Sequence, residues 1–213
     1  MMIEIFQDVV CPWCRIGKAN LMAALAQFTD EPVEVHYRAF QLDPTTPVEG
    51  LQFREMMRSK MHASDDQLSG MFGQVTQAGQ AAGLHFDFSK VEYMPNTLRA
   101  HQLIAIAPEA SKQRLVDALF KAYFEDGLDV GNVEVLLDIA ESQGMDRAKT
   151  AASLQAKEGL EQVEDDLEFA RGAGVSGVPF FVVNRKYALT GAQPPATFLQ
   201  ALQQISAEQD NAE

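Results

Sequence analysis

The chain has 213 residues, of which 46% are hydrophobic and 22% charged, so it is long enough to bury a sizeable core and has an ordinary globular composition. Its formal net charge of -13 argues against general binding to nucleic acid or anionic membranes, because both need a basic surface. The N-terminus lacks the pattern of a signal peptide, and no apolar run approaches the length of a membrane span. We therefore expect a cytoplasmic protein of one domain with an elaboration.

The first 41 residues predict a strand, a helix and a second strand. Residues 3–7 are a short apolar run typical of a buried strand, and residues 12–28 carry apolar side chains at helical spacing. Residues 33–41 alternate between apolar and polar side chains, which is typical of a strand. This order begins an α/β unit.

The only two cysteines of the chain, Cys11 and Cys14, lie at the start of the predicted helix and enclose Pro12 and Trp13. Proline is tolerated in the first helical turn, where its missing N–H removes no hydrogen bond. The spacing then puts both sulfurs on one face, close enough for a disulfide without rearranging the backbone.

We predict that Cys11 is the nucleophile of this pair. It would stand at the N-terminus of the helix, where unpaired N–H groups and the helix dipole stabilise a thiolate, with Arg15 adding positive charge. Cys14 would lie one turn deeper as a neutral thiol that resolves the mixed disulfide.

Three other interpretations of the cysteines stay open: a structural disulfide, half of a zinc site, or two core thiols. Zinc is the weakest, because two thiolates leave two ligand positions to be filled from four scattered histidines or from carboxylates. We therefore predict no metal. In a reducing compartment, a catalytic pair is favoured over a structural disulfide.

The middle of the chain, residues 45–157, predicts helices and no strand. Two prolines within residues 41–47 mark its start. After a helix at 158–171, strands are expected at 180–183 and 187–190, then a helix at 195–206 and a frayed polar tail at 207–213. We predict a discontinuous α/β domain, 1–44 and 158–213, with an all-helical domain, 45–157, inserted into it.

Several short motifs are spread over nearly the whole chain: DVVCPWC at 8–14, FQLDP at 40–44, NTLRAH at 96–101, GVPFFV at 177–182 and GAQP at 191–194. In this order they resemble the DsbA-like family of thioredoxin-fold thiol-disulfide oxidoreductases, and look most like its cytoplasmic FrnE-like branch. The resemblance implies an α/β thioredoxin fold with the helical insertion.

The resemblance also implies disulfide exchange with protein or small-molecule thiols through Cys11 and Cys14. No bound cofactor is implied, although glutathione or another redox protein would recycle the pair. Pro179 would be cis and lie beside Cys11, so that the backbone of Val178 could align an extended substrate; the alternative is a trans proline that starts a strand. Pro12 and Trp13 complete the substrate-binding candidates.

Weaker candidates each have a structural interpretation beside the functional one. Trp13 either forms part of the substrate surface or packs in the core. Asp8 either relays protons for Cys14 or ends a strand. Asn96 either contacts a ligand or caps a helix, and His101 either faces the cysteines or belongs to the core. For all three residues the structural role is the simpler interpretation. The same choice, between an adaptable peptide groove and the core, applies to four methionines: Met56, Met57, Met61 and Met71.

Two rival functions stay open. The fold with its insertion also resembles the kappa-class glutathione transferases and the 2-hydroxychromene-2-carboxylate isomerases, which typically have a serine at the position of Cys11; both cysteines count against that assignment. The other rival is a non-catalytic peptide-binding or chaperone module. The physiological substrate, the direction of electron transfer and the oligomeric state do not follow from the sequence.

Overall fold

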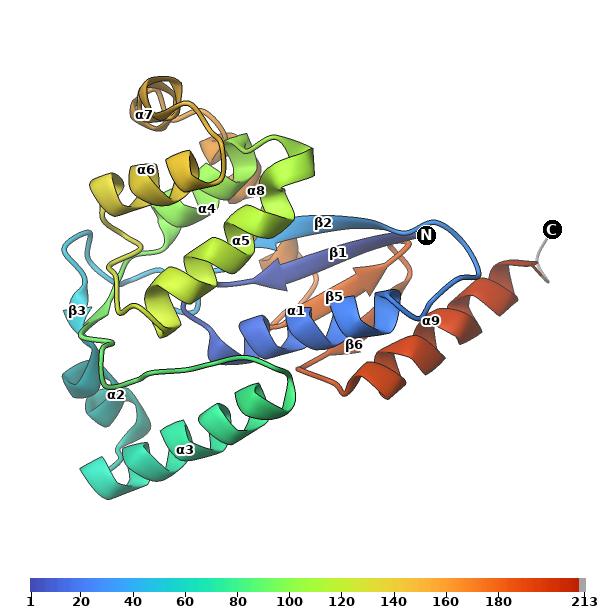
Figure 1. Cartoon of the computed structure of the whole chain (residues 1–213), viewed down its shortest axis with the longest axis horizontal. Coiled ribbons are helices and arrows are strands. Elements are labelled where there is room, and N and C mark those ends of the chain that lie inside the picture. The colour runs from blue at the N-terminus through green and yellow to red at the C-terminus, as the bar shows by residue number, and fades with distance from the viewer. Residues whose placement is uncertain (211–213) are drawn as a thin grey trace.

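The centre of the fold is a four-stranded mixed sheet (Figure 1). The computed structural model describes residues 1–210, with side chains up to Glu208. The sheet has the order β2-β1-β5-β6, in which β1 and β2 are parallel and the other neighbours antiparallel. Its strands are β1 (Met2–Gln7), β2 (Glu34–Ala39), β5 (Phe180–Val183) and β6 (Tyr187–Thr190). Both ends of the chain therefore build one sheet.

Alternate residues of the central strand β1 pack on opposite faces of the sheet, as the two-residue period of a strand requires. Ile3 and Ile5 join the main core with α1 (Pro12–Leu25) and α9 (Pro195–Asp210), which lie side by side. Phe6 joins a smaller cluster on the other face, beside α8 (Leu160–Gly172). The sheet is thus covered by helices on both faces.

The remaining helices lie between β2 and α8 in the chain. They are α2 (Phe53–Met61), α3 (Asp65–Ala81), α4 (Leu98–Ile106), α5 (Glu109–Phe124), α6 (Val133–Ser142) and α7 (Arg147–Gln155). Helices α4 to α7 pack together, whereas α2 and α3 lie apart from them; α3 and α5 both contact α1 (Figure 1). The helix that begins with the cysteines is therefore flanked from two sides.

The prediction that residues 45–157 contain no strand is wrong. Strands β3 (Leu51–Gln52) and β4 (Tyr93–Met94) form a small antiparallel sheet. A two-residue strand is too short to produce a recognisable alternation, so the helical periodicity around it dominated. The predicted α/β class is confirmed, and the division into a discontinuous domain and an inserted domain stays a prediction.

The last helix is longer than expected, because α9 continues to Asp210 and includes residues predicted as a frayed tail. The rest of that predicted tail, 211–213, lies outside the described residues. Within residues 1–210, none of the helices combines the length and the apolar character needed to span a bilayer.

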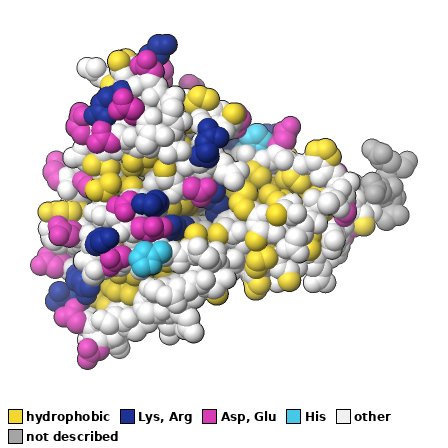
Figure 2. All heavy atoms as spheres, viewed as in Figure 1, with side chains coloured by type: hydrophobic (Ala, Val, Ile, Leu, Met, Phe, Trp, Pro, Cys, Tyr) yellow, Lys and Arg dark blue, Asp and Glu magenta, His cyan; other side chains and the backbone are white. Residues whose placement is uncertain are grey.

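The face of the molecule seen in Figure 2 is divided by side-chain type. Charged side chains gather over the part formed by α2 to α7, whereas few charged side chains and many hydrophobic ones appear over α1 and α9. Basic and acidic groups are interspersed in the charged part, so this face has no uniform basic patch.

Candidate active site

The turn between β1 and α1 places the two cysteines. The N–H of Cys11 donates to the carbonyl of Asp8 at 2.9 Å, and the N–H of Cys14 donates to the carbonyl of Cys11 at 3.1 Å. Cys11 is the N-cap and Pro12 the first residue of α1. Proline fits there because the backbone N–H of the first helical residue, which proline lacks, would have no partner within the helix. Cys11 therefore lies at the positive end of the helix, as the spacing predicts.

Cys14 is fully buried and, like Cys11, is a free thiol. Burial raises the pKa of Cys14 well above its ordinary value, and contact with Cys11 and the charge of Asp8 act in the same direction, against a backbone hydrogen bond from Asp8. At neutral pH, Cys14 is accordingly a neutral thiol. That is the state in which a resolving cysteine waits.

The loop before β5 approaches the cysteines from the far end of the chain. The Sγ atom of Cys11 lies 3.6 Å from the carbonyl oxygen of Val178, and the peptide bond between Val178 and Pro179 is cis. Gly17 of α1 packs tightly under this loop, since a Cβ atom there would lie 2.8 Å from Cγ of Pro179. Helix α1 and the loop therefore hold Cys11 beside the backbone of Val178.

An apolar cavity of ≈ 320 Å³ opens beside Cys11. Trp13 lines it and is 43% exposed, so its side chain lies at the rim and the alternative of a core position is wrong. Among the four methionines, Met61 is half exposed and lies elsewhere, whereas the other three line the cavity. The lining also includes Pro12, Leu42, Phe53, Met56, Met57, Met71, Phe72, Phe88 and Val178.

Stacked phenylalanines from separate elements form one wall of this cavity. Phe72 of α3 stacks on Phe88 at 4.6 Å between ring centroids and on Phe53 of α2 at 5.6 Å. Phe88 also meets the ring of Phe124 at the end of α5 edge to face. Contacts of this kind fix ring orientations beyond what burial alone would do. The wall depends on α2, α3 and α5 keeping their positions.

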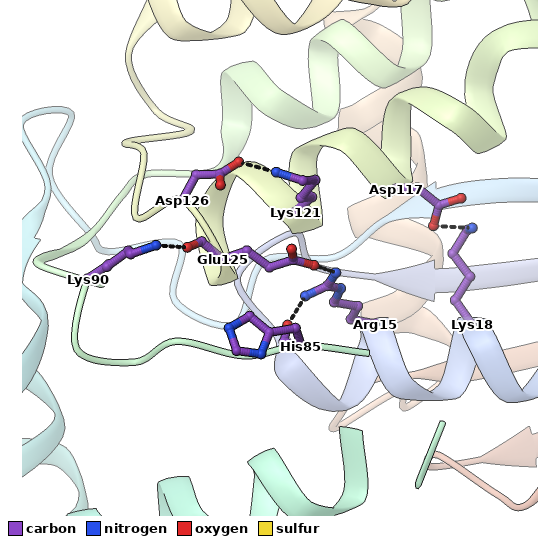
Figure 3. Close-up of polar contacts among 8 residues, drawn as sticks. All are labelled: Arg15, Lys18, His85, Lys90, Asp117, Lys121, Glu125 and Asp126. Atoms are coloured by element: carbon purple, nitrogen blue, oxygen red, sulfur yellow. Dashed lines mark hydrogen bonds and ion pairs between the residues drawn. The ribbon is translucent and has the colours of Figure 1, made fainter. Parts of the chain in front are cut away.

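Arg15 is paired with groups other than Cys11, in contrast to the sequence-based expectation that it would face the cysteine. Its guanidinium forms an ion pair with Glu125 and donates to the carbonyl of His85 at 2.6 Å (Figure 3). It also lies over the ring of Phe86. One turn on, Lys18 pairs with Asp117 at 2.6 Å. The two basic residues of α1 therefore join this helix to the loop between α3 and β4, through His85, and to α5 and the residue after it, through Asp117 and Glu125. The charge of Arg15 is balanced by that of Glu125.

Asp8 and His101 form a buried pair behind the cysteines. Nε2 of His101 lies 3.2 Å from Oδ1 of Asp8, and the other carboxylate oxygen of Asp8 accepts from the N–H of Leu42 at 2.8 Å. Both side chains are almost completely buried. His101 therefore reaches Asp8 and does not line the apolar cavity.

The model of the DSBA-like thioredoxin domain family matches residues 2–203. The chain belongs to this family. It is 33% identical to a probable DsbA oxidoreductase from Streptomyces coelicolor, whose crystal structure superposes with a TM-score of 0.89 over 96% of this chain and 89% of that one. The thioredoxin fold with helical elaboration expected from the sequence motifs is thereby confirmed.

Two more distant structures share the fold with this DsbA-like chain. A 2-hydroxychromene-2-carboxylate isomerase is 17% identical, with a TM-score of 0.71 over 100% of both chains. The cytosolic disulfide reductase DsbM from Pseudomonas aeruginosa, solved with GSH, is 19% identical, with a TM-score of 0.67 over 96% of this chain and 98% of that one.

The side chain of Asn96 is hydrogen-bonded to the backbone at two places in this DsbA-like chain. Its side-chain oxygen accepts from the N–H of Leu98 at 3.0 Å at the start of α4, and its amide donates to the carbonyl of Thr46 at 2.7 Å. It is absent from the lining of the apolar cavity. These contacts account for Asn96 without a ligand.

Sequence reasoning missed the phenylalanines of the cavity wall and the partner of Arg15. Phe53 is the first residue of α2 and Phe88 lies in the loop between α3 and β4, where no periodicity assigns a face, and Glu125 follows the last residue of α5. Within residues 1–210, no group of three or more histidine, cysteine or acidic side chains is placed to hold a metal ion.

Proposed function

We propose that this protein is a thiol-disulfide oxidoreductase in which Cys11 attacks or carries the disulfide and Cys14 resolves it. One observation carries the proposal: Cys11 caps α1 directly above a buried thiol and faces both an apolar cavity and the carbonyl of Val178. Membership in the DsbA-like family supports it.

In the reducing direction, the Cys11 thiolate attacks one sulfur of a substrate disulfide. A bond forms between Cys11 and that sulfur, and the other substrate sulfur leaves with the electron pair. Cys14 then loses its proton and attacks the sulfur of Cys11, which releases the second substrate thiolate and leaves a Cys11–Cys14 disulfide. The substrate has gained two electrons and the protein has lost two; the reverse sequence oxidises a dithiol.

Substrates are protein or small-molecule thiols and disulfides with an apolar group next to the sulfur. The cavity beside Cys11 is lined mainly by methionine and aromatic side chains, which adapt to different apolar shapes. The carbonyl of Val178 offers an acceptor to the backbone N–H of an extended peptide. Pro12, Trp13, Val178 and Pro179 form the substrate-binding surface around Cys11.

The reaction needs no bound cofactor, and glutathione or another redox protein returns the pair to its starting state. The shared fold with the cytosolic reductase DsbM, solved with GSH, supports glutathione as co-substrate and a cytoplasmic location. Assignment to the FrnE-like branch rests on the sequence motifs alone and stays a prediction.

A glutathione-dependent isomerase or transferase is the second candidate. The cavity volume of ≈ 320 Å³ lies within the range of small-molecule sites, roughly 300–1,000 Å³, and the fold is shared with a 2-hydroxychromene-2-carboxylate isomerase. Such an enzyme would use glutathione bound near Cys11 and would not need Cys14. Glutathione-dependent turnover of a small aromatic substrate by the Cys14→Ser variant would favour this candidate.

The deciding experiment is a titration of the Cys11/Cys14 pair in glutathione redox buffers, with free thiols read by alkylation and mass spectrometry. We expect a reversible intramolecular disulfide, lost in Cys11→Ser, and a mixed disulfide trapped on Cys11 in Cys14→Ser. The midpoint potential of the intramolecular Cys11–Cys14 disulfide gives the direction of electron transfer. A wild-type protein that forms only a stable glutathione adduct on Cys11 would overturn the proposal and favour the second candidate.

A further inference from the structure

A second, much smaller cavity of ≈ 10 Å³ lies between β2, α4 and α8 and is bordered by His101. The side chains of Gln7 and Tyr37 also line it. Both are buried, and neither the amide of Gln7 nor the hydroxyl of Tyr37 has a hydrogen-bond partner among residues 1–210. This cavity shares no lining residue with the apolar cavity beside Cys11.

Unpaired buried amides and hydroxyls are strongly unfavourable, so folded proteins satisfy them with ordered water where space allows. A cavity of about 10–15 Å³ holds one water molecule if two to four polar groups surround it. Gln7, Tyr37, His101 and Asp166 supply such groups at the walls of the small cavity. The site therefore has the size and chemistry for an ordered water.

The small cavity leads outward through an ion pair. Arg38 and Asp166, whose side chains lie 3.1 Å apart, line both the small cavity and an open surface pocket of ≈ 420 Å³. Arg38 is partly exposed, and Phe169 and Arg185 form the exposed border of this pocket. Polar groups thus continue from His101 to solvent.

Inward, His101 leads to Cys14 through Asp8, whose backbone N–H and carboxylate charge both act on the Cys14 thiol. His101 is hydrogen-bonded to Asp8 at 3.2 Å, and Asp8 begins the turn that carries the cysteines. The charged and titratable groups that face this pair are Cys14 from α1, Tyr37 and Arg38 from β2, Tyr123 from α5 and Asp166 from α8.

We propose that Asp8, His101 and a water held by Gln7 and Tyr37 form a proton path from Cys14 to the surface pocket at Arg38 and Asp166. The inference rests on the proposed function. When Cys14 attacks the mixed disulfide on Cys11, its proton passes to the Asp8–His101 pair. The pair releases a proton through the water to solvent, while the electron pair leaves on the substrate sulfur.

This arrangement separates proton release from substrate binding. Cys14 has no exposed surface, and a substrate joined to Cys11 would fill the apolar cavity in front of it. A route through His101 opens on different residues, so the bound substrate does not block it. His101 acts on the proton through Asp8, and Gln7 and Tyr37 position the water. None of the three is placed to touch the substrate.

The test uses the aromatic disulfide 5,5′-dithiobis(2-nitrobenzoate) in stopped flow, because it releases one coloured thiolate when Cys11 attacks and a second when Cys14 resolves. Both releases are followed from about pH 6 to about pH 9 in the wild type, His101→Ala and the double variant Gln7→Leu/Tyr37→Phe. Ile104→Val, which changes an apolar part of the same cavity wall, is the matched control.

We expect His101→Ala to slow the second release about 10-fold or more near pH 7, as loss of a general acid–base group does, with the first release unchanged. Added imidazole should restore part of that rate in His101→Ala but none in Cys14→Ser. If His101→Ala does not fold, Gln7→Leu/Tyr37→Phe provides the test, and its second release should be slowed while its first release is unchanged. Second-release rates equal to those of Ile104→Val would overturn the path and leave the proposed function intact, whereas a wild type without a second release would contradict the function itself.

Discussion

The Sγ atom of Cys11 lies 3.6 Å from the carbonyl oxygen of Val178, a residue 167 positions further along the chain. The contact joins the first turn of α1 to the loop that leads into β5. It brings the proposed nucleophile next to a backbone acceptor that an extended substrate can use. Reactivity at Cys11 should therefore depend on how closely this loop packs against α1.

Gly17→Ala tests that packing. The new methyl group would lie 2.8 Å from Cγ of Pro179 and 3.3 Å from Phe181, so the loop must move away from α1. We expect a loss of about 1–3 kcal/mol in the free energy of unfolding, measured by urea denaturation, together with slower disulfide exchange. Gly73→Ala in α3 is the matched control, because nothing lies within 4 Å of its added methyl. It should stabilise the protein by about 0.5–1 kcal/mol; equal effects of the two changes would contradict the packing argument.

Met57→Gln tests the apolar cavity as the substrate-binding site. Met57 lines the cavity and Met61 does not, although both belong to α2. The polar amide should weaken binding of apolar disulfide substrates, raising their KM by about 5- to 10-fold, because apolar contact area is lost. Steady-state kinetics with an apolar peptide disulfide measure this effect. Met61→Gln should leave that KM unchanged, and a similar rise in both variants would argue against the cavity.

Glu125→Gln tests the ion pair that joins α1 to α5. Arg15 is almost fully buried, so removing the negative charge of Glu125 leaves a buried cation without its anionic partner. We expect a loss of about 2–3 kcal/mol in the free energy of unfolding, reduced from the fully buried case because Glu125 is 22% exposed. Urea denaturation gives the value.

The exposed pair of Arg147 with Glu134 provides the comparison for Glu125. Glu134→Gln should change the free energy of unfolding by less than about 1 kcal/mol, as surface ion pairs do. A loss as large as that of Glu125→Gln would mean that burial of Arg15 does not matter.

The raised pKa of Cys14 predicts how stability varies with pH. Between the thiol pKa of the unfolded chain, about 8.5, and the higher pKa in the folded protein, the folded state binds more protons than the unfolded state. The free energy of unfolding should therefore fall as pH rises above about 8.5, by at most about 1.4 kcal/mol per pH unit from this group. Urea denaturation of the reduced protein should show this extra slope in the wild type and not in Cys14→Ser. Parallel slopes would contradict the burial of a protonated thiol.

Local features of the sequence determined much of this protein. The placement of Cys11 at the start of a helix and of Cys14 in its first turn, the proline at the first helical position and the strands at 180–183 and 187–190 all follow from periodicity and capping over a few residues. The motif order also led to the thioredoxin fold and the DsbA-like family, because it samples nearly the whole chain.

Only the tertiary structure decided which distant groups meet. Arg15 could equally have faced Cys11, but packing of α1 against α5 turned it to Glu125, 110 positions away. His101 reached Asp8 across 93 positions, and Phe53, Phe72 and Phe88 became one cavity wall. Such contacts depend on how the helices and the sheet pack against one another. Sequence periodicity shows which face of a helix or strand is apolar, but it does not show which distant side chains that face will contact.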